Sequence, residues 1–165
     1  MARKSVSIPT TSGSGARLFS QQCLTFLPAR VQGRWFYLCL ILDLFSRKIV
    51  GFEVHETDTA EHAAHLVRRT ALSEGVHAGP TRPVLHGDNG ATLKATTVLA
   101  MLAWLGIAPS HSRPRVSDDN AFAEALFRTA KYRPEFPARG FADLDAARRW
   151  AEMAKILCGW AAAGS

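Results

Sequence analysis

The sequence of 165 residues contains few cysteines, no long apolar run and no acidic residue before Asp43. Its three cysteines are widely spaced and odd in number, a pattern that suits neither a disulfide framework nor the paired spacing of a zinc site. The longest apolar run, WFYLCLIL at residues 35–42, is too short to cross a bilayer. These absences favour a cytoplasmic protein with reduced thiols and no membrane span.

The charge balance is basic. Lysine and arginine number 20 against 14 acidic residues, which gives a net charge of +6. Such a balance favours polyanionic partners, above all nucleic acid. Residues 1–21 carry basic side chains among serines and threonines, with too little apolar surface to fold, so we expect a disordered basic arm there. Residues 22–160 are long enough for one domain with a core of its own.

The apolar pattern of residues 22–160 predicts an α/β fold with a mixed five-stranded sheet flanked by helices. Residues 34–44 are nearly continuous in apolar character, which is typical of a strand with neighbours on both sides. The tight connection to residues 47–56 predicts an antiparallel hairpin. The five expected strands cover residues 23–27, 34–44, 47–56, 83–87 and 107–111.

The expected helices are marked by caps and apolar stripes. Asp58 and Glu61 match a capping box at the start of the first helix, and Gly75 matches its end. A second helix of about a dozen residues is expected to stop at Gly106. Two further helices are expected over residues 121–131 and from Asp143 onward.

One carboxylate stands out in the stretch VLHGDNGATLK at residues 84–94. Asp88 directly follows a short apolar strand, and the carboxyl ends of strands are where α/β sheets place their sites. Glu124 follows with 35 residues between the two. Carboxylate oxygens are the ligands that Mg²⁺ prefers, and two such ions can assist the cleavage of a phosphodiester. Asp88 and Glu124 are therefore candidate catalytic residues and metal ligands.

Basic residues surround the second of these carboxylates. Arg128 and Lys131 follow Glu124 at i+4 and i+7, hence on one helix face, and Arg113 and Arg115 lie in the preceding loop. A row of cations beside a metal-binding carboxylate suits a phosphate backbone, so these four residues are candidate DNA contacts. On these residues alone, a surface helix with one Glu–Arg pair is an equally good interpretation.

Three longer stretches carry a family resemblance: GRWFYLCLILDLFSRKIVGFEV, HGDNG and SRPRVSDDNAFAEALFRTAKYRPEFP. They resemble the integrase catalytic core of bacterial insertion-sequence (DDE) transposases, within the retroviral-integrase superfamily, over residues 24–150. The resemblance implies a ribonuclease-H-like fold and cutting and joining of DNA strands with Mg²⁺ or Mn²⁺. It also implies three catalytic carboxylates, of which Asp88 matches the second and Glu124 the third, and it implies that Lys131 approaches DNA.

The first carboxylate of that pattern is missing. The stretch QQCLTFLP at residues 21–28 matches the first strand of the family, and Cys23 stands where the resemblance requires Asp. A thiol is a soft ligand that suits Mg²⁺ poorly, so we expect impaired metal binding. The sequence therefore predicts a degenerate transposase core for DNA integration, altered before Gln22 and cut short after Trp150. The alternative is a non-catalytic remnant that binds DNA or an intact transposase, and enzymatic activity is left open.

Other residues have simpler explanations. Asp43 could replace the missing ligand, but an Asp before Phe-Ser-Arg resembles a position that orders the hairpin. Asp118 and Asp119 suit the cap of the Glu124 helix. His62 and His65 stand at i and i+3 without a third zinc ligand nearby in sequence.

The expected partner is DNA, which in the intact family means transposon ends and target. A homo-oligomer or a complex with an intact transposase is also consistent with the resemblance, and a membrane partner is not. The expected location is the bacterial cytoplasm, with the nucleoid. The sequence does not specify which DNA ends are recognised.

Overall fold

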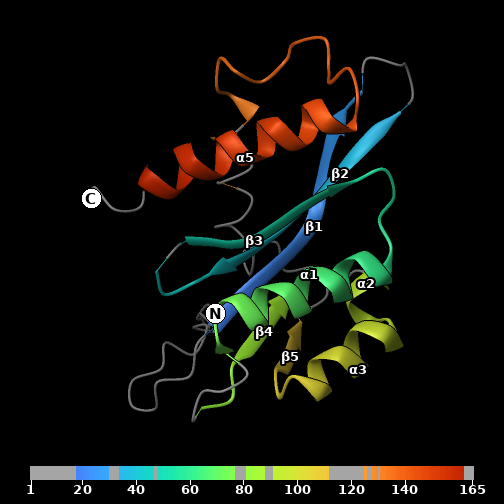
Figure 1. Cartoon of the computed structure of the whole chain (residues 1–165), viewed down its shortest axis with the longest axis vertical. Helices are drawn as coiled ribbons and strands as arrows, with labels where there is room; N and C mark the ends of the chain where they lie inside the picture. Colours follow the sequence, from blue (N-terminus) through green and yellow to red (C-terminus); the bar gives the residue numbers. More distant parts are fainter. Residues whose placement is uncertain are drawn as a thin grey trace, which may run out of the picture.

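The computed structural model describes residues 18–29, 34–46, 48–76, 81–87, 91–111, 125, 128–129 and 131–161. At its centre is one sheet with the strand order β3-β2-β1-β4-β5 (Figure 1). β2 pairs antiparallel with β1 and β3, whereas β4 runs parallel to β1 and to β5. The mixed α/β architecture expected from the sequence is confirmed. The strands are β1 (Leu18–Pro28), β2 (Trp35–Asp43), β3 (Lys48–His55), β4 (Val84–Gly87) and β5 (Ala108–His111).

The first strand is longer than the sequence predicted. β1 begins at Leu18, so the residues at 18–21 that were assigned to the basic arm belong to the sheet. These four residues pair in parallel with the whole of β4, from Leu18 opposite Val84 to Gln21 opposite Gly87. The backbone hydrogen bonds of this distant partner hold Ser20 and Gln21 in a strand although their polar side chains give no strand pattern. Residues 1–17 lie outside the described part of the chain.

The β2–β3 hairpin is the antiparallel pair that the sequence predicted, with Asp43 opposite Lys48. Asp43 is buried at 4% exposure. Its Oδ1 accepts hydrogen bonds from the backbone N–H groups of Phe45, at 3.0 Å, and Ser46, at 3.4 Å. A carboxylate that accepts from the backbone two and three residues ahead stabilises a turn. The expected structural role of Asp43 in ordering the hairpin therefore has a direct geometric basis.

Helix boundaries differ from the predicted ones in two places. The N-cap of α1 (Ala60–Ser73) is Thr59, whose side chain accepts from the N–H of His62, and Asp58 stands one residue earlier. The helix of about a dozen residues expected to reach residue 105 is α3 (Thr96–Trp104), which is shorter than predicted. Ala95, extended at φ −61° and ψ 141°, separates it from a short helix that was not predicted, α2 (Ala91–Lys94). Because alanine favours helix, nothing in the local sequence predicts this interruption. Gly106 ends α3 with φ +70°, as expected.

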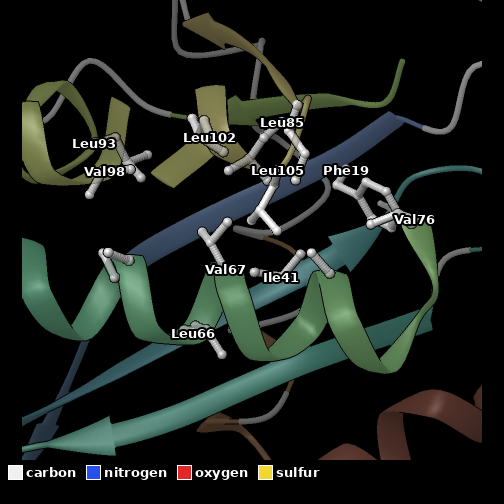
Figure 2. Packing of buried hydrophobic residues seen from close by; sticks show 14 of the residues in the cluster. Phe19, Ile41, Leu66, Val67, Val76, Leu85, Leu93, Val98, Leu102 and Leu105 are labelled. Atoms are coloured by element: carbon white, nitrogen blue, oxygen red, sulfur yellow. The ribbon is translucent and has the colours of Figure 1, made fainter. Parts of the chain in front are cut away.

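The helices cover both faces of the sheet, which gives three layers (Figure 1). On one face, Leu66 and Val67 of α1 lie with Ile41 of β2, Leu85 of β4 and side chains of α3 (Figure 2). On the other face, α5 (Leu144–Ala161) packs against alternate residues of β2 and against β3. Both clusters are made of buried apolar side chains, whose removal from water supplies the main stabilising free energy. The second cluster consists of Leu27, Phe36, Leu38, Leu40, Leu42, Val54, Phe141, Ala147, Trp150 and Ala151.

Candidate active site

The candidate site lies at the carboxyl end of β4, where the register of three parallel strands fixes the backbone. Gly87, the last residue of β4, lies opposite Gln21 of β1 and His111 of β5. The chain continues from Gly87 to Asp88. Cys23 stands two residues beyond Gln21, about 7 Å further along β1 in the direction in which β4 also runs. The backbone of β1 therefore carries Cys23 past the level at which the chain leaves the sheet for Asp88.

Asp43 lies on the opposite side of this level. It pairs with Phe19, and Phe19 pairs with Leu85, which is two residues before Gly87. Asp43 is thus about 7 Å short of the strand end along the strand direction, and β1 separates it from β4. Its Oδ1 also accepts from the turn that follows it. This position favours the hairpin role of Asp43 over the alternative role as a metal ligand that the sequence left open.

Four of the predicted site residues, Asp88, Arg113, Arg115 and Glu124, lie outside the described residues, as do Asp118 and Asp119. The side chain of Cys23 is likewise not described, although its backbone pairs with Cys39. The predicted juxtaposition of Asp88 and Glu124 stays a prediction.

Arg128 and Lys131 are described, and both are exposed. Their segment is helical where it is described: the hydroxyl of Thr129 donates to the carbonyl of Ala125 at 2.9 Å, and the N–H of Tyr132 donates to the carbonyl of Arg128 at 3.2 Å. Two exposed cationic side chains three positions apart on a helical segment lie on the same face. Both side chains are available to an anionic partner.

Two hydrogen bonds hold the segments on either side of Asp88. His86 of β4 bonds through Nδ1 to the hydroxyl of Ser110 on β5, at 3.1 Å. Further along the chain, the hydroxyl of Thr92 on α2 donates to Oδ2 of Asp58 at 3.3 Å. Sequence reasoning assigned Asp58 only to a helix cap and did not single out Thr92. No sequence signal could pair them, because 34 positions separate the two.

A separate polar cluster surrounds Glu53 of β3. One carboxylate oxygen bonds Nε2 of His55 at 2.9 Å, and the other contacts Nδ1 of His65 at 3.0 Å and Arg69 at 3.3 Å. The ring of His62 stacks on that of His55 with centroids 3.7 Å apart. Within the described residues, no three His, Cys, Asp or Glu side chains form a group that could hold a metal ion.

The outer edge of the sheet, β3, is covered by two arginines from opposite faces. Arg69 of α1 donates through Nη2 to the carbonyl of Phe52 at 2.7 Å, and Arg148 of α5 donates through Nε to the carbonyl of Val54 at 3.3 Å. Arg69 and Arg148 line an open groove of about 630 Å³. Exposed edge strands promote association between chains, and charged side chains over the edge oppose it.

Comparison with known proteins places the chain in a family. The family model described as "Integrase core domain" matches residues 23–117, which is more than half of the sequence. The chain therefore belongs to the integrase core domain family.

Curated relatives come from bacterial insertion sequences. The putative transposase InsK for insertion sequence element IS150, from Escherichia coli K12, is 29% identical over 101 residues, covering 61% of this chain and 35% of the relative. Transposase InsF for insertion sequence IS3A, from the same strain, is 26% identical over 108 residues, covering 66% and 36%. The chain thus spans about a third of the length of these relatives.

A solved structure shares the fold. A chain in the cryoEM structure of the simian T-cell lymphotropic virus intasome in complex with PP2A regulatory subunit B56 gamma aligns with a TM-score of 0.57. The alignment covers 87% of this chain and 46% of that chain, at 14% sequence identity. Among the described residues, no helix combines the length and the apolar character needed to span a membrane.

Proposed function

We propose that this chain is the ribonuclease-H-like catalytic core of a DNA transposase, in a degenerate form in which Cys23 occupies the position of the first catalytic Asp. Asp88 and Glu124 are the two remaining catalytic carboxylates. The observation that carries the proposal is the register of β1 against β4, which brings Cys23 past the strand end that leads to Asp88. Family membership supports DNA integration as the ancestral reaction.

The donor set fits a divalent metal only in part. Asp88 and Glu124 offer the hard oxygen donors that suit Mg²⁺ or Mn²⁺, whereas Cys23 offers a soft sulfur. In a complete carboxylate site, such ions activate the attacking hydroxyl and stabilise the leaving oxygen at a phosphodiester. With a thiol in the first position, the chain binds these ions weakly and the strand-cutting reaction is lost.

A second function is supported by the basic surface. Arg128 and Lys131 are exposed on a helical segment, and together with Arg113 and Arg115 they form a cationic set for a phosphate backbone. The chain then acts as a non-catalytic protein of the bacterial nucleoid that binds DNA or associates with an intact transposase. This function does not depend on residue 23.

The experiment that tests the proposal compares the unmodified chain with Cys23→Asp in a nicking assay on supercoiled plasmid DNA with Mg²⁺ or Mn²⁺. We expect no metal-dependent nicking from the unmodified chain and measurable nicking from Cys23→Asp. The matched control is Cys23→Ser, which changes the thiol to an oxygen but adds no charge and restores nothing.

Two results would oppose the assignment of Cys23. Nicking by the unmodified chain that disappears in Asp43→Asn would show that Asp43 supplies the ligand. Nicking by Cys23→Asp that survives Asp88→Asn would show that Asp88 is not a catalytic residue.

A further inference from the structure

Tyr132 places an exposed aromatic ring beside the two exposed cations of the candidate DNA surface. Its side chain is 80% exposed, and its backbone N–H donates to the carbonyl of Arg128, four residues earlier, at 3.2 Å. Residues four positions apart in a helical turn are neighbours on its surface. Lys131 directly precedes Tyr132. The ring therefore belongs to the same surface as the two cations.

The segment that carries this ring is anchored to the core. Phe136, four residues later, makes edge-to-face contacts with Phe141 and Trp150, with ring centroids 5.7 and 5.3 Å apart. Both partners are buried, and the N–H of Phe136 donates to the carbonyl of Arg133 at 3.0 Å. Core packing thus uses the ring of Phe136 and leaves the ring of Tyr132 outside, next to a fixed part of the molecule.

The charges around the ring favour an anionic partner. Residues 128–139 contain four cationic side chains against one acidic side chain: Arg128, Lys131, Arg133 and Arg139 against Glu135. A flat ring among cations suits a ligand that offers both negative charge and flat aromatic faces, as nucleic acid does. In a duplex, neighbouring base pairs cover these faces, so a base can stack on the ring only where it is unpaired.

We propose that Tyr132 stacks on an unpaired base of DNA while Arg128 and Lys131 contact the phosphates of the same strand. This inference rests on the proposed DNA-binding function and adds a substrate class to it, namely DNA with a single-stranded stretch or an opened end. The ring carries no charge, so its contribution to affinity does not depend on salt, whereas that of the two cations does.

The test measures the affinity of the full chain for three probes by fluorescence anisotropy: an oligothymidylate, an abasic oligodeoxynucleotide of the same length, and a hairpin duplex. Tyr132→Ala should weaken binding to the oligothymidylate about tenfold and leave the other two affinities unchanged. Tyr132→Phe keeps the ring and should bind like the unmodified chain. Tyr132→Leu keeps apolar bulk without a ring and should behave like Tyr132→Ala. The matched control is Trp104→Ala, which removes a 68% exposed ring from α3, a helix without charged residues, and should change none of the three affinities.

Salt separates the two kinds of contact. The loss of oligothymidylate affinity in Tyr132→Ala should be the same at low and at physiological salt, whereas the loss in Arg128→Ala should shrink as salt rises.

Three results would overturn the stacking role. The first is oligothymidylate affinity that is unchanged in Tyr132→Ala. The second is an equal loss for the abasic probe or the duplex, which would show that Tyr132 acts through the sugar-phosphate backbone or through the fold. The third is an unmodified chain that binds none of the three probes, in which case the DNA-binding function itself fails and the stacking role fails with it.

Discussion

Replacement of Gly51 by alanine tests the packing of α1 on the sheet most directly. Gly51 is buried in β3, and a Cβ at this position would overlap the Oγ1 of Thr70 and lie 3.2 Å from Cδ1 of Leu66. Both neighbours are buried in α1. Adding atoms to a well-packed contact costs about 1–3 kcal/mol, and the gain in strand propensity of alanine over glycine offsets about 0.5–1 kcal/mol.

Because the added Cβ would overlap Oγ1 of Thr70, the packing cost lies at the upper end of its range, and the expected net loss in the free energy of unfolding is about 2 kcal/mol. For a chain of this length, such a loss lowers Tm by roughly 4–8 °C. Circular dichroism during thermal and urea unfolding measures both quantities. The comparison variant is Gly75→Ala: a Cβ there meets no atom within 4 Å, but φ is +64°. Its cost is limited to the left-handed backbone conformation, about 1–2 kcal/mol.

A double variant identifies the clash as the cause. Oγ1 of Thr70 is buried and has no hydrogen-bond partner among the described residues, so Thr70→Ala removes the overlapping atom without breaking a hydrogen bond. The double variant Gly51→Ala with Thr70→Ala should lose less free energy of unfolding than the sum of the losses of the two single variants, by at least about 1 kcal/mol. Strict additivity, or a loss below about 0.5 kcal/mol in Gly51→Ala, would refute the reasoning.

Three further predictions concern the surface and the hairpin. Arg128→Ala with Lys131→Ala should weaken binding to duplex DNA of any sequence and reduce the slope of log K against log salt by about two, as measured by fluorescence anisotropy. If the DNA affinity of the unmodified chain is the same at low and physiological salt, binding through phosphates is contradicted. Arg69→Ala with Arg148→Ala should expose the carbonyls of β3 and cause concentration-dependent association in analytical ultracentrifugation. The control Arg149→Ala, at an exposed neighbour on α5, should show the same association state as the unmodified chain. Asp43→Ala should cost about 2 kcal/mol in urea unfolding because two turn N–H groups lose their acceptor, and Asp43→Asn, which keeps an oxygen there, should cost clearly less.

Local pattern was sufficient for the elements whose signals lie within a few residues. The continuous apolar run of β2, the hairpin to β3 and the buried stripe of α1 were all predicted, because each depends on periodicity and turn chemistry in one short window. The left-handed glycines after α1 and α3 were predicted for the same reason.

Non-local contacts explain the errors. The start of β1 at Leu18 depends on pairing with β4, more than 60 positions away, and residues FSQQ carry no strand pattern of their own. The break at Ala95 coincides with the attachment of α2 to Asp58, which again lies far away in sequence. Distant partners can override local propensity in this way.

The sequence by itself determined the family and predicted the chemistry of the candidate site. Motifs such as HGDNG and the Cys in QQCLTFLP are readable residue by residue, because identity and spacing are properties of the chain. The tertiary structure decided which residues lie at the same level of the sheet. The parallel register of β1 and β4 puts Cys23 beyond the end of β4 and Asp43 before it, and only the assembled sheet contains that information, since a shift of one residue in pairing would change every neighbour.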